Sequence, residues 1–224
     1  MCGRFAQRTD PKRVAKWFGV EDVPELEPRY NIAPTQEILG VRETEDGREM
    51  AFYKWGLIPS WAEDTSMGAR LINARSETVR EKPAFRHAFK QRHCIIPADG
   101  YYEWQKTGGR KQPYYFTMHD ERPFGFAGLW DRWKITEGEV IETCTILTTE
   151  TNDNARELHD RMPVILHPED YDLWLDEDVR KLDLLKELFR PYPSQEMLTY
   201  PVSALVNNVR PDGAELIKKL INSY

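Results

Sequence analysis

The sequence has few cysteines and no long apolar run. Its three cysteines, Cys2, Cys94 and Cys144, lie far apart, a spacing that fits neither a disulfide framework nor a zinc site. No apolar stretch reaches the roughly 18 residues of a membrane-spanning helix, and polar residues interrupt the N-terminal segment where a signal peptide would need apolar ones. We therefore expect a cytoplasmic protein that uses no metal and no cofactor.

The sequence also lacks an excess of positive charge, internal repeats and low-complexity tracts. It carries 31 Lys and Arg against 37 Asp and Glu, a formal net charge of -6 over 224 residues. This balance argues against a broadly basic coat for nucleic acid, but a local basic groove is compatible with it because binding follows the distribution of charge. With 40% hydrophobic residues and no clear linker, residues 1–224 are expected to fold as a single globular domain.

Local patterns predict helices towards the ends of the chain and strands in its middle. Asp10 and Pro11 favour a helix start, and Gly19 favours its end. Asp46-Gly47 favours a hairpin turn between residues 37–43 and 48–57, and Gly108-Gly109 favours another turn. Strands and helices do not alternate, which predicts an α+β fold with a curved antiparallel β-barrel-like core flanked by helices. Further strands are expected at 93–96, 101–105, 113–118, 124–130 and 140–148, and further helices at 83–90, 168–175, 179–189 and 214–221.

Cys2 is the first candidate for chemistry. An initiator Met is usually removed when a small residue follows, which would leave Cys2 with an α-amine and a thiol on adjacent carbons. The amine, whose ordinary pKa is about 7.7–8.0, condenses with an aldehyde to an imine, and the thiol then closes a thiazolidine ring. Arg4 would favour the nucleophilic thiolate. Against this reading, residue 2 is often arbitrary and chain ends fray.

Six clusters of polar, aromatic, Gly and Pro residues interrupt the strand and helix patterns. Each is a weak signal alone, but together they form an ordered series that follows Met1-Cys2-Gly3-Arg4-Phe5. The clusters lie at residues 29–34, 55–61, 72–78, 97–104, 158–164 and 201–207. In this order they resemble the SRAP family (SOS response-associated peptidase) over nearly the whole chain, from Cys2 to about residue 215.

The resemblance implies a fold, an activity and a set of catalytic residues. The family fold is an α+β domain with a β-barrel-like core and one positively charged DNA groove. Its members crosslink covalently to abasic sites in single-stranded DNA through the N-terminal cysteine, and autoproteolysis exposes that cysteine; an AP-lyase activity is expected beside it. By the resemblance, Cys2 is the nucleophile, Asn73 holds the abasic residue, and Glu103 and His159 move protons and stabilise the opened sugar.

Each of these polar residues also has an ordinary structural interpretation. Asn73 alone is typical of a turn or cap. Glu103 lies among aromatic residues in a predicted strand, where a solvated face would explain it, and His159 alone could be a structural histidine. The joint pattern, rather than any single residue, favours catalysis.

The residues expected to bind DNA lie inside the same clusters. Arginines there would give bidentate phosphate contacts, and aromatic residues beside a Gly/Pro loop would stack on bases with little sequence preference. The acidic segment Glu63-Asp64 departs from what a DNA-facing loop would prefer. The candidates are Arg4, Asn31, Trp55, Trp61, Arg75 and Arg161.

Two other classes of function stay open from the residues alone. One is a general thiol peptidase with Cys2 as nucleophile and His159 as base. The other is a non-covalent reader of damaged or modified DNA that uses the Trp and Arg residues without chemistry. For the crosslinking function we expect a monomer that acts in the DNA damage (SOS) response. Its partners would be single-stranded DNA with abasic sites and proteins of the replication fork, and it would be nucleoid-associated when bound to DNA.

Overall fold

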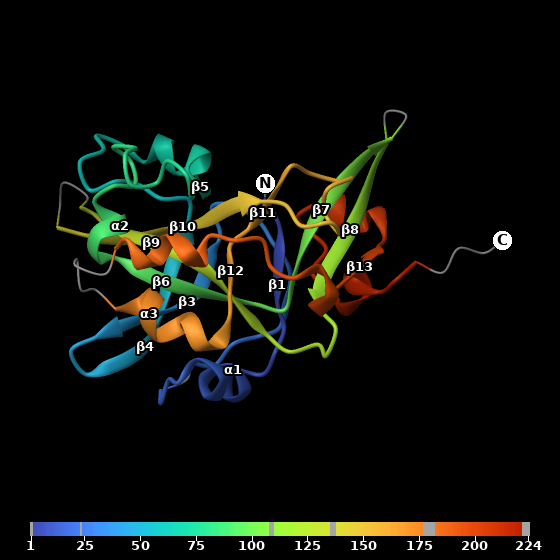
Figure 1. Cartoon of the computed structure of the whole chain (residues 1–224), viewed down its shortest axis with the longest axis horizontal. Helices are drawn as coiled ribbons and strands as arrows, with labels where there is room; N and C mark the ends of the chain where they lie inside the picture. Colours follow the sequence, from blue (N-terminus) through green and yellow to red (C-terminus); the bar gives the residue numbers. More distant parts are fainter. Residues whose placement is uncertain (1, 23, 108–109, 135–137, 177–181, 221–224) are drawn as a thin grey trace.

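Two β-sheets that pack on a shared core form the centre of the chain (Figure 1). The computed structural model describes residues 2–22, 24–107, 110–134, 138–176 and 182–220. One sheet has five strands in the order β13-β8-β7-β1-β2. Its strands are β1 (Phe5–Gln7), β2 (Arg29–Ile32), β7 (Gly100–Thr107), β8 (Arg110–Met118) and β13 (Met197–Pro201).

The second sheet closes on itself as a barrel. Its path runs β10-β4-β3-β6-β9, and β9 pairs again with β10. The barrel strands are β3 (Glu37–Thr44), β4 (Gly47–Trp55), β6 (His93–Ala98), β9 (Phe124–Lys134) and β10 (Val140–Glu150). Three short strands extend this sheet: β5 (Asn73–Arg75) and β11 (Arg161–Pro163) on β10, and β12 (Ile165–Leu166) on β9.

The barrel-like α+β core confirms the predicted fold class, and one feature of the pairing differs from the prediction. Strand β10 runs parallel to both β4 and β5, whereas an antiparallel core was expected. The chain can make these parallel pairs because long connections separate β10 from both strands, which no local hairpin signal reveals. The predicted hairpin of β3 and β4 is confirmed, with Thr44 opposite Gly47.

Among the described residues, α-helices are fewer and shorter than the sequence predicts. Helix α1 (Pro11–Phe18) matches the prediction: the Asp10 side chain accepts from the backbone of Lys12 and Arg13, and Gly19 ends the helix at φ 71°. The other α-helices are α2 (Ala88–Gln91) and α3 (Tyr171–Leu175). Short 3₁₀ helices lie at Thr65–Arg70, Pro168–Asp170, Leu184–Leu188, Ser194–Glu196, Ala204–Asn207 and Ala214–Ile217.

Three helix predictions therefore need correction. Residues 83–87 form turns before α2, and single 3₁₀ segments stand where helices were predicted at 179–189 and 214–221. These segments carry apolar residues at helical spacing, but tertiary packing rather than a long helix buries them. Residues 179–181 and 221, and the turn predicted at Gly108-Gly109, lie outside the described residues. No helix among the described residues is both long enough and apolar enough to cross a membrane.

Successive side chains along each strand of the five-stranded sheet point to opposite faces, so the sheet contributes to two separate buried clusters. Phe5, Tyr101 and Phe116 face the barrel and join its buried cluster, whereas Ala6 and Tyr102 face the opposite side. Segments near the C-terminus cover that opposite side with Val202, Val206 and Leu216. A third cluster packs α1 and α3 against the outside of the barrel. Strand β1 is thus held by its two neighbouring strands and by a buried cluster on each face of its sheet.

His93 on β6 makes the stability of this core depend on pH. Its Nε2 donates to the Phe89 carbonyl at 2.8 Å, its ring lies 4.5 Å from that of Trp174, and its Nδ1 is buried without a hydrogen-bond partner among the described residues. Burial lowers the pKa of His93 to about 4. Because the unfolded chain binds this proton near pH 6.5, unfolding is favoured progressively as the pH falls from 6.5 to 4.

We predict that His93→Gln flattens this pH dependence. Glutamine keeps an N–H donor for the Phe89 carbonyl but cannot be protonated. The wild type should lose about 3 kcal/mol of unfolding free energy from this residue between pH 6.5 and 4, and the variant should not. Urea unfolding of both proteins at several pH values measures the difference. Parallel pH profiles for the two proteins would contradict the assignment.

Candidate active site around Cys2

Strand pairing fixes the position of Cys2. Phe5 of β1 lies opposite Tyr101 of β7, and the Tyr102 N–H donates to the Arg4 carbonyl at 3.0 Å, so the first residues run along β7. The Cys2 side chain is fully buried in the barrel-facing core. The start of the chain is therefore anchored, in contrast to the frayed end that is usual for a terminus.

Asn73 lies against Cys2 because β5 pairs with β10. Asn73 stands opposite Ile146 in that parallel pair, and its Nδ2 donates to the Cys2 carbonyl at 2.8 Å. Its Oδ1 is buried and accepts no hydrogen bond among the described residues. A buried amide oxygen without a donor carries a desolvation cost, and it offers an acceptor to a hydroxyl that enters the pocket.

Glu103 brings a carboxyl group to the same pocket. It lies two residues after Tyr101 on β7, so both side chains point to the barrel side, and it is 4% exposed. Burial raises the pKa of Glu103, and the charge of Asp160 raises it further. A solvated strand face, the ordinary interpretation of this residue, is therefore wrong, and the carboxyl group can exchange protons nearer to neutral pH than an exposed glutamate.

The Arg4 guanidinium does not activate the thiol as expected: Arg4 lowers the pKa of Cys2 only through its backbone hydrogen bond, and burial outweighs this effect. Burial strongly raises the pKa of the Cys2 thiol, and the negative charge of Glu103 raises it further. The Arg4 guanidinium is held by other groups. The thiol therefore keeps its proton in the resting protein, and a base within the pocket must remove it before sulfur can attack.

His159 precedes Asp160, a residue whose charge acts on Glu103. Its Nδ1 lies 3.0 Å from the backbone nitrogen of Arg161 and 2.8 Å from Oδ1 of Asp160. When the ring is neutral and Nδ1 carries no proton, Nδ1 accepts a hydrogen bond from the Arg161 N–H. When the ring is protonated, Nδ1 donates to the Asp160 carboxylate. The side chain is about one third exposed.

Tyr101 is a polar group of the pocket that sequence reasoning missed. Its hydroxyl is buried without a hydrogen-bond partner among the described residues, and its ring stacks on Phe116 at 4.7 Å. Burial raises its pKa, as do the charges of Glu103 and Cys2, which places the hydroxyl near both groups. The signal in the sequence is the two-residue spacing from Glu103, which puts both side chains on one face of a strand.

Two residues expected to contact DNA instead hold the C-terminal segment. Arg4 Nη1 donates to Asn31 Oδ1 at 2.6 Å and to the Val206 carbonyl at 2.7 Å. Asn31 Nδ2 in turn donates to the carbonyls of Asn208 and Pro211. Both side chains are buried, so Arg4 and Asn31 are not available to phosphates in this structure.

The two tryptophans of the Gly/Pro loop have opposite surroundings. Trp55 is fully buried, its Nε1 donates to the Ile72 carbonyl at 2.9 Å, and its ring meets Phe5 edge-on. The prediction that Trp55 stacks on bases is therefore wrong for this structure. Trp61 is 56% exposed, as a stacking platform requires.

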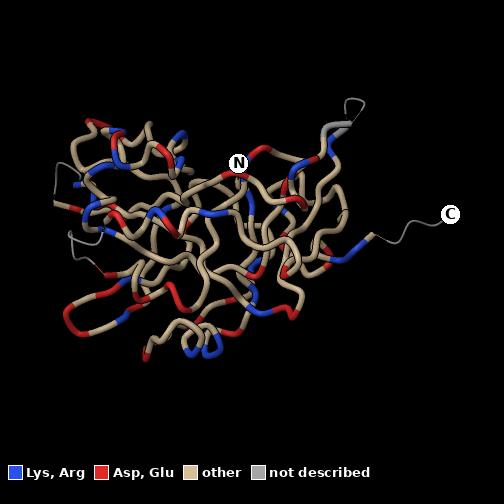
Figure 2. Tube along the Cα trace, viewed as in Figure 1, with Lys and Arg blue, Asp and Glu red and all other residues tan. Residues whose placement is uncertain are grey.

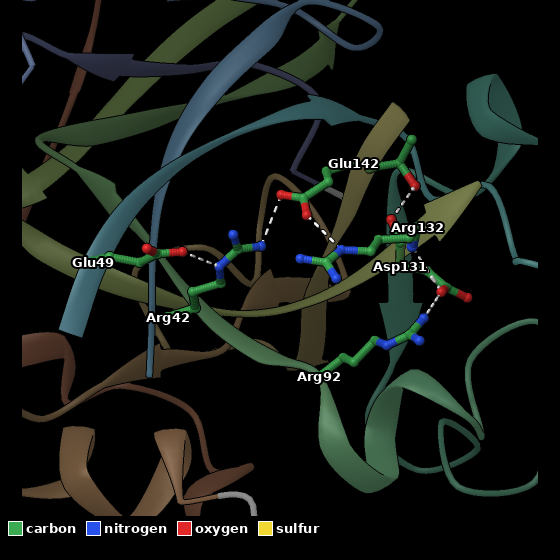
Figure 3. A network of polar contacts seen from close by, with 7 residues as sticks. Arg42, Glu49, Arg92, Asp131, Arg132 and Glu142 are labelled. Carbon is green, nitrogen blue, oxygen red and sulfur yellow. Dashed lines mark hydrogen bonds and ion pairs between the residues drawn. The ribbon is translucent and has the colours of Figure 1, made fainter. Parts of the chain in front are cut away.

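The loop that carries Trp61 is tied to β9 and β10. Asp131, which is buried, accepts from the Ser60 backbone at 3.0 Å and pairs with Arg92. Next to it, Glu142 bridges Arg42 and Arg132 (Figure 3). The backbone next to Trp61 is therefore held in place by Asp131. Two further bonds hold the loop: Ile58 N to Thr143 Oγ1 at 2.9 Å, and Trp133 Nε1 to the Ala62 carbonyl at 2.7 Å.

The two remaining arginines flank the pocket on either side of β10. Arg75 on β5 is exposed. The Arg161 side chain on β11 is 11% exposed, and Glu77 binds it through both carboxylate oxygens at 2.9 Å. Figure 2 shows acidic and basic residues interspersed along the described part of the trace.

Comparison with known proteins gives the family. The chain belongs to the SOS response associated peptidase (SRAP) family, whose family model matches residues 1–209. It is 40% identical over 222 residues to the abasic site processing protein YoqW of Bacillus subtilis, which covers 97% of this chain and 99% of that protein. It is 31% identical over 225 residues to the abasic site processing protein YedK of Escherichia coli, covering 97% of this chain and 99% of that protein.

Relatives extend to animals, and solved structures share the fold. The abasic site processing protein HMCES of Xenopus tropicalis is 30% identical over 267 residues, covering 99% of this chain and 79% of that protein. A crystal structure of a protein from Bacteroides thetaiotaomicron superposes with a TM-score of 0.87 at 27% identity, covering 98% of this chain and all of that one. The family named by the sequence resemblance is therefore confirmed.

Proposed function

We propose that this protein processes abasic sites by forming a thiazolidine crosslink between Cys2 and the ring-opened abasic sugar in single-stranded DNA. The observation that carries the proposal is the placement of Cys2, which is anchored at the start of the chain and buried close to Asn73 and Glu103. The names of the relatives, abasic site processing proteins, support the same substrate.

The reaction needs a free α-amine on Cys2, so Met1 must first leave. The amine attacks the sugar aldehyde at C1′, and the carbinolamine loses water to give an imine. The thiol then adds to the imine carbon, and its proton passes to the ring nitrogen. One aldehyde and one aminothiol thus give one thiazolidine and one water, with no oxidant or reductant.

The pocket residues supply the proton transfers of this sequence. Glu103, whose pKa burial raises, accepts a proton from the amine or the thiol and returns it to the departing water. Asn73 Oδ1 accepts from a hydroxyl of the opened sugar and holds C1′ near Cys2. His159 acts on the sugar oxygen during ring opening and adduct reversal.

Two side activities follow from the same groups. The Cys2 thiol would attack the carbonyl carbon of Met1, which moves the methionyl group from the Cys2 nitrogen to its sulfur, and one water would then hydrolyse this thioester to release methionine and free both the amine and the thiol. This is the autopeptidase reaction suggested by the family description. The imine also acidifies the sugar C2′ protons, so that loss of one of them expels the 3′ phosphate as an AP lyase does. A non-covalent reader of damaged DNA is the second candidate, and the exposed Trp61 and Arg75 favour it.

The first prediction concerns Cys2 itself. Intact-mass spectrometry of the protein mixed with a single-stranded oligonucleotide carrying one abasic site should show a protein that begins at Cys2, joined to the DNA with loss of one water. Cys2→Ala should bind the strand without a stable adduct, and Cys2→Ser should give an imine that borohydride traps. A protein with an uncleaved N-terminal tag should not react, because its acylated amine cannot form the imine. A heat-stable adduct of the tagged protein would exclude the thiazolidine.

The second prediction separates the roles of the pocket residues. At saturating protein, Glu103→Gln should slow adduct formation by about 10- to 10⁴-fold, the range for loss of a general acid or base. Asn73→Ala should also slow crosslinking of bound DNA, and His159→Ala should change ring opening or adduct reversal more than DNA affinity. Gel time courses of formation and reversal on one abasic oligonucleotide measure all three. If both Glu103→Gln and His159→Ala form and reverse the adduct at the wild-type rates, neither residue takes part in the mechanism.

The third prediction concerns the DNA surface. Trp61→Ala should weaken binding to single-stranded DNA by about tenfold, the loss of one stacked base. Arg75→Ala should weaken binding and reduce the slope of log K against log salt by about 0.7. Phe52→Ala, which removes another exposed aromatic, and Arg13→Ala, which removes an exposed cation on α1, are the matched controls. If Trp61→Ala binds DNA as tightly as Phe52→Ala, and Arg75→Ala as tightly as Arg13→Ala, then Trp61 and Arg75 do not contact the DNA.

A further inference from the structure

The Arg161 guanidinium is already occupied in the protein without DNA. Its Nη1 and Nη2 each donate to one oxygen of the Glu77 carboxylate at 2.9 Å. Its Nε donates to Thr148 Oγ1 at 3.2 Å, and Nη2 also donates to the Thr148 carbonyl at 2.6 Å. One Nη1 hydrogen is then left for a phosphate, because a guanidinium has a single N–H on Nε and two on each Nη.

The Glu77 carboxylate uses the two N–H donors of Arg161 that a phosphate would need for a bidentate contact. Carboxylates and phosphates bind arginine in the same bidentate way, through two parallel N–H···O bonds. Although burial raises the pKa of Glu77, the hydrogen bonds and charge of Arg161 and the charge of Arg75 lower it overall, so Glu77 is ionised near neutral pH. Glu77 thus reduces the positive potential of both arginines that flank the pocket.

Thr148 shows that Arg161 does not need Glu77 to stay in position. Thr148 is fully buried on β10, between β5 and β11, and its contacts to Nε and Nη2 would remain if the carboxylate moved. The Glu77 side chain is 49% exposed, so it can turn towards solvent. A released carboxylate would leave a guanidinium that is still oriented by Thr148, with a free pair of N–H donors.

We propose that Glu77 is an internal anion that occupies Arg161 in place of a DNA phosphate and weakens binding to single strands that lack an abasic site. DNA binding then exchanges one anion for another on Arg161. The exchange keeps non-covalent affinity low, whereas a strand captured at Cys2 is retained by its covalent bond. This inference rests on the proposed function, because it takes single-stranded DNA as the ligand.

The test compares Glu77→Gln with Glu81→Gln. Glu81 lies four residues further on, is exposed, and has no ion pair among the described residues, so both variants change the net charge equally. The affinity of each protein for an undamaged oligothymidine is measured by fluorescence anisotropy between about 50 and 200 mM salt. Glu77→Gln should bind roughly three- to tenfold tighter than Glu81→Gln, with a salt slope steeper by about 0.7, because one more uncompensated cation meets the strand.

A double-mutant cycle shows whether Glu77 acts through Arg161. In an Arg161→Gln background, Glu77→Gln should give no more gain than Glu81→Gln. Equal affinities of the two single variants, weaker binding of Glu77→Gln, or an undiminished gain without Arg161 would each overturn the proposal. If Glu77→Gln melts below the wild type, Glu77→Asp replaces it: the shorter carboxylate keeps the charge but loses the two-point contact, and a smaller gain is expected.

The proposed function is checked separately on the wild type. If the wild-type protein forms no adduct with an abasic oligonucleotide, the proposed function fails whatever the Glu77 variants do. If the wild type reacts and Glu77→Gln gains no affinity, the inference about Glu77 alone is wrong.

Discussion

The pairing of β10 on both of its edges is the constraint on which the site depends. Towards its end, this strand lies between β5 on one side and β11 on the other, with Thr148 opposite Arg75 and Pro163. Asn73 and Arg75 therefore lie along one edge of β10, and Arg161, which His159 contacts, lies along the other. The same strand closes the barrel against β9. A change that shifts the register of β10 would displace the site and open the core together.

The site around Cys2 contains buried polar groups that lower the stability of the fold. The hydroxyl of Tyr101 and the Oδ1 of Asn73 are buried without partners among the described residues, and Glu103 is a carboxyl group whose pKa burial raises. Each lowers stability relative to an apolar or satisfied group. Such costs are typical of a functional site, where groups must stay available to a substrate. His93 Nδ1 and the Tyr53 hydroxyl are also buried without partners among the described residues, so the proximity of Asn73, Glu103 and Tyr101 to Cys2, rather than burial alone, supports the proposed chemistry.

Much of the architecture could be predicted from local signals, and burial could not. The hairpin of β3 and β4 and helix α1 follow from turn and cap residues that act within a few positions. The parallel pairs of β10 depend on contacts between distant segments, which no local pattern encodes. The N-terminal segment and the clusters contain Cys2, Asn73 and Glu103, which the structure brings close together. The same clusters gave no sign that Trp55 would be buried, since a Gly/Pro loop can fold over an aromatic ring or expose it.

Arg4 and Asn31 show why a cluster near a reactive residue need not contact substrate. Arg4 follows Cys2 by two positions, and its side chain points to the other side of the sheet, where it bonds Asn31 and the Val206 carbonyl and lies over the Trp104 ring. Its backbone carbonyl meanwhile accepts from Tyr102. The segment around Val206 is thus connected through Arg4 to the strand that begins at Cys2. Phosphate contact would require Arg4 to leave these partners, whereas anchoring uses all of them, so the structure favours a role in holding Cys2 beside Glu103.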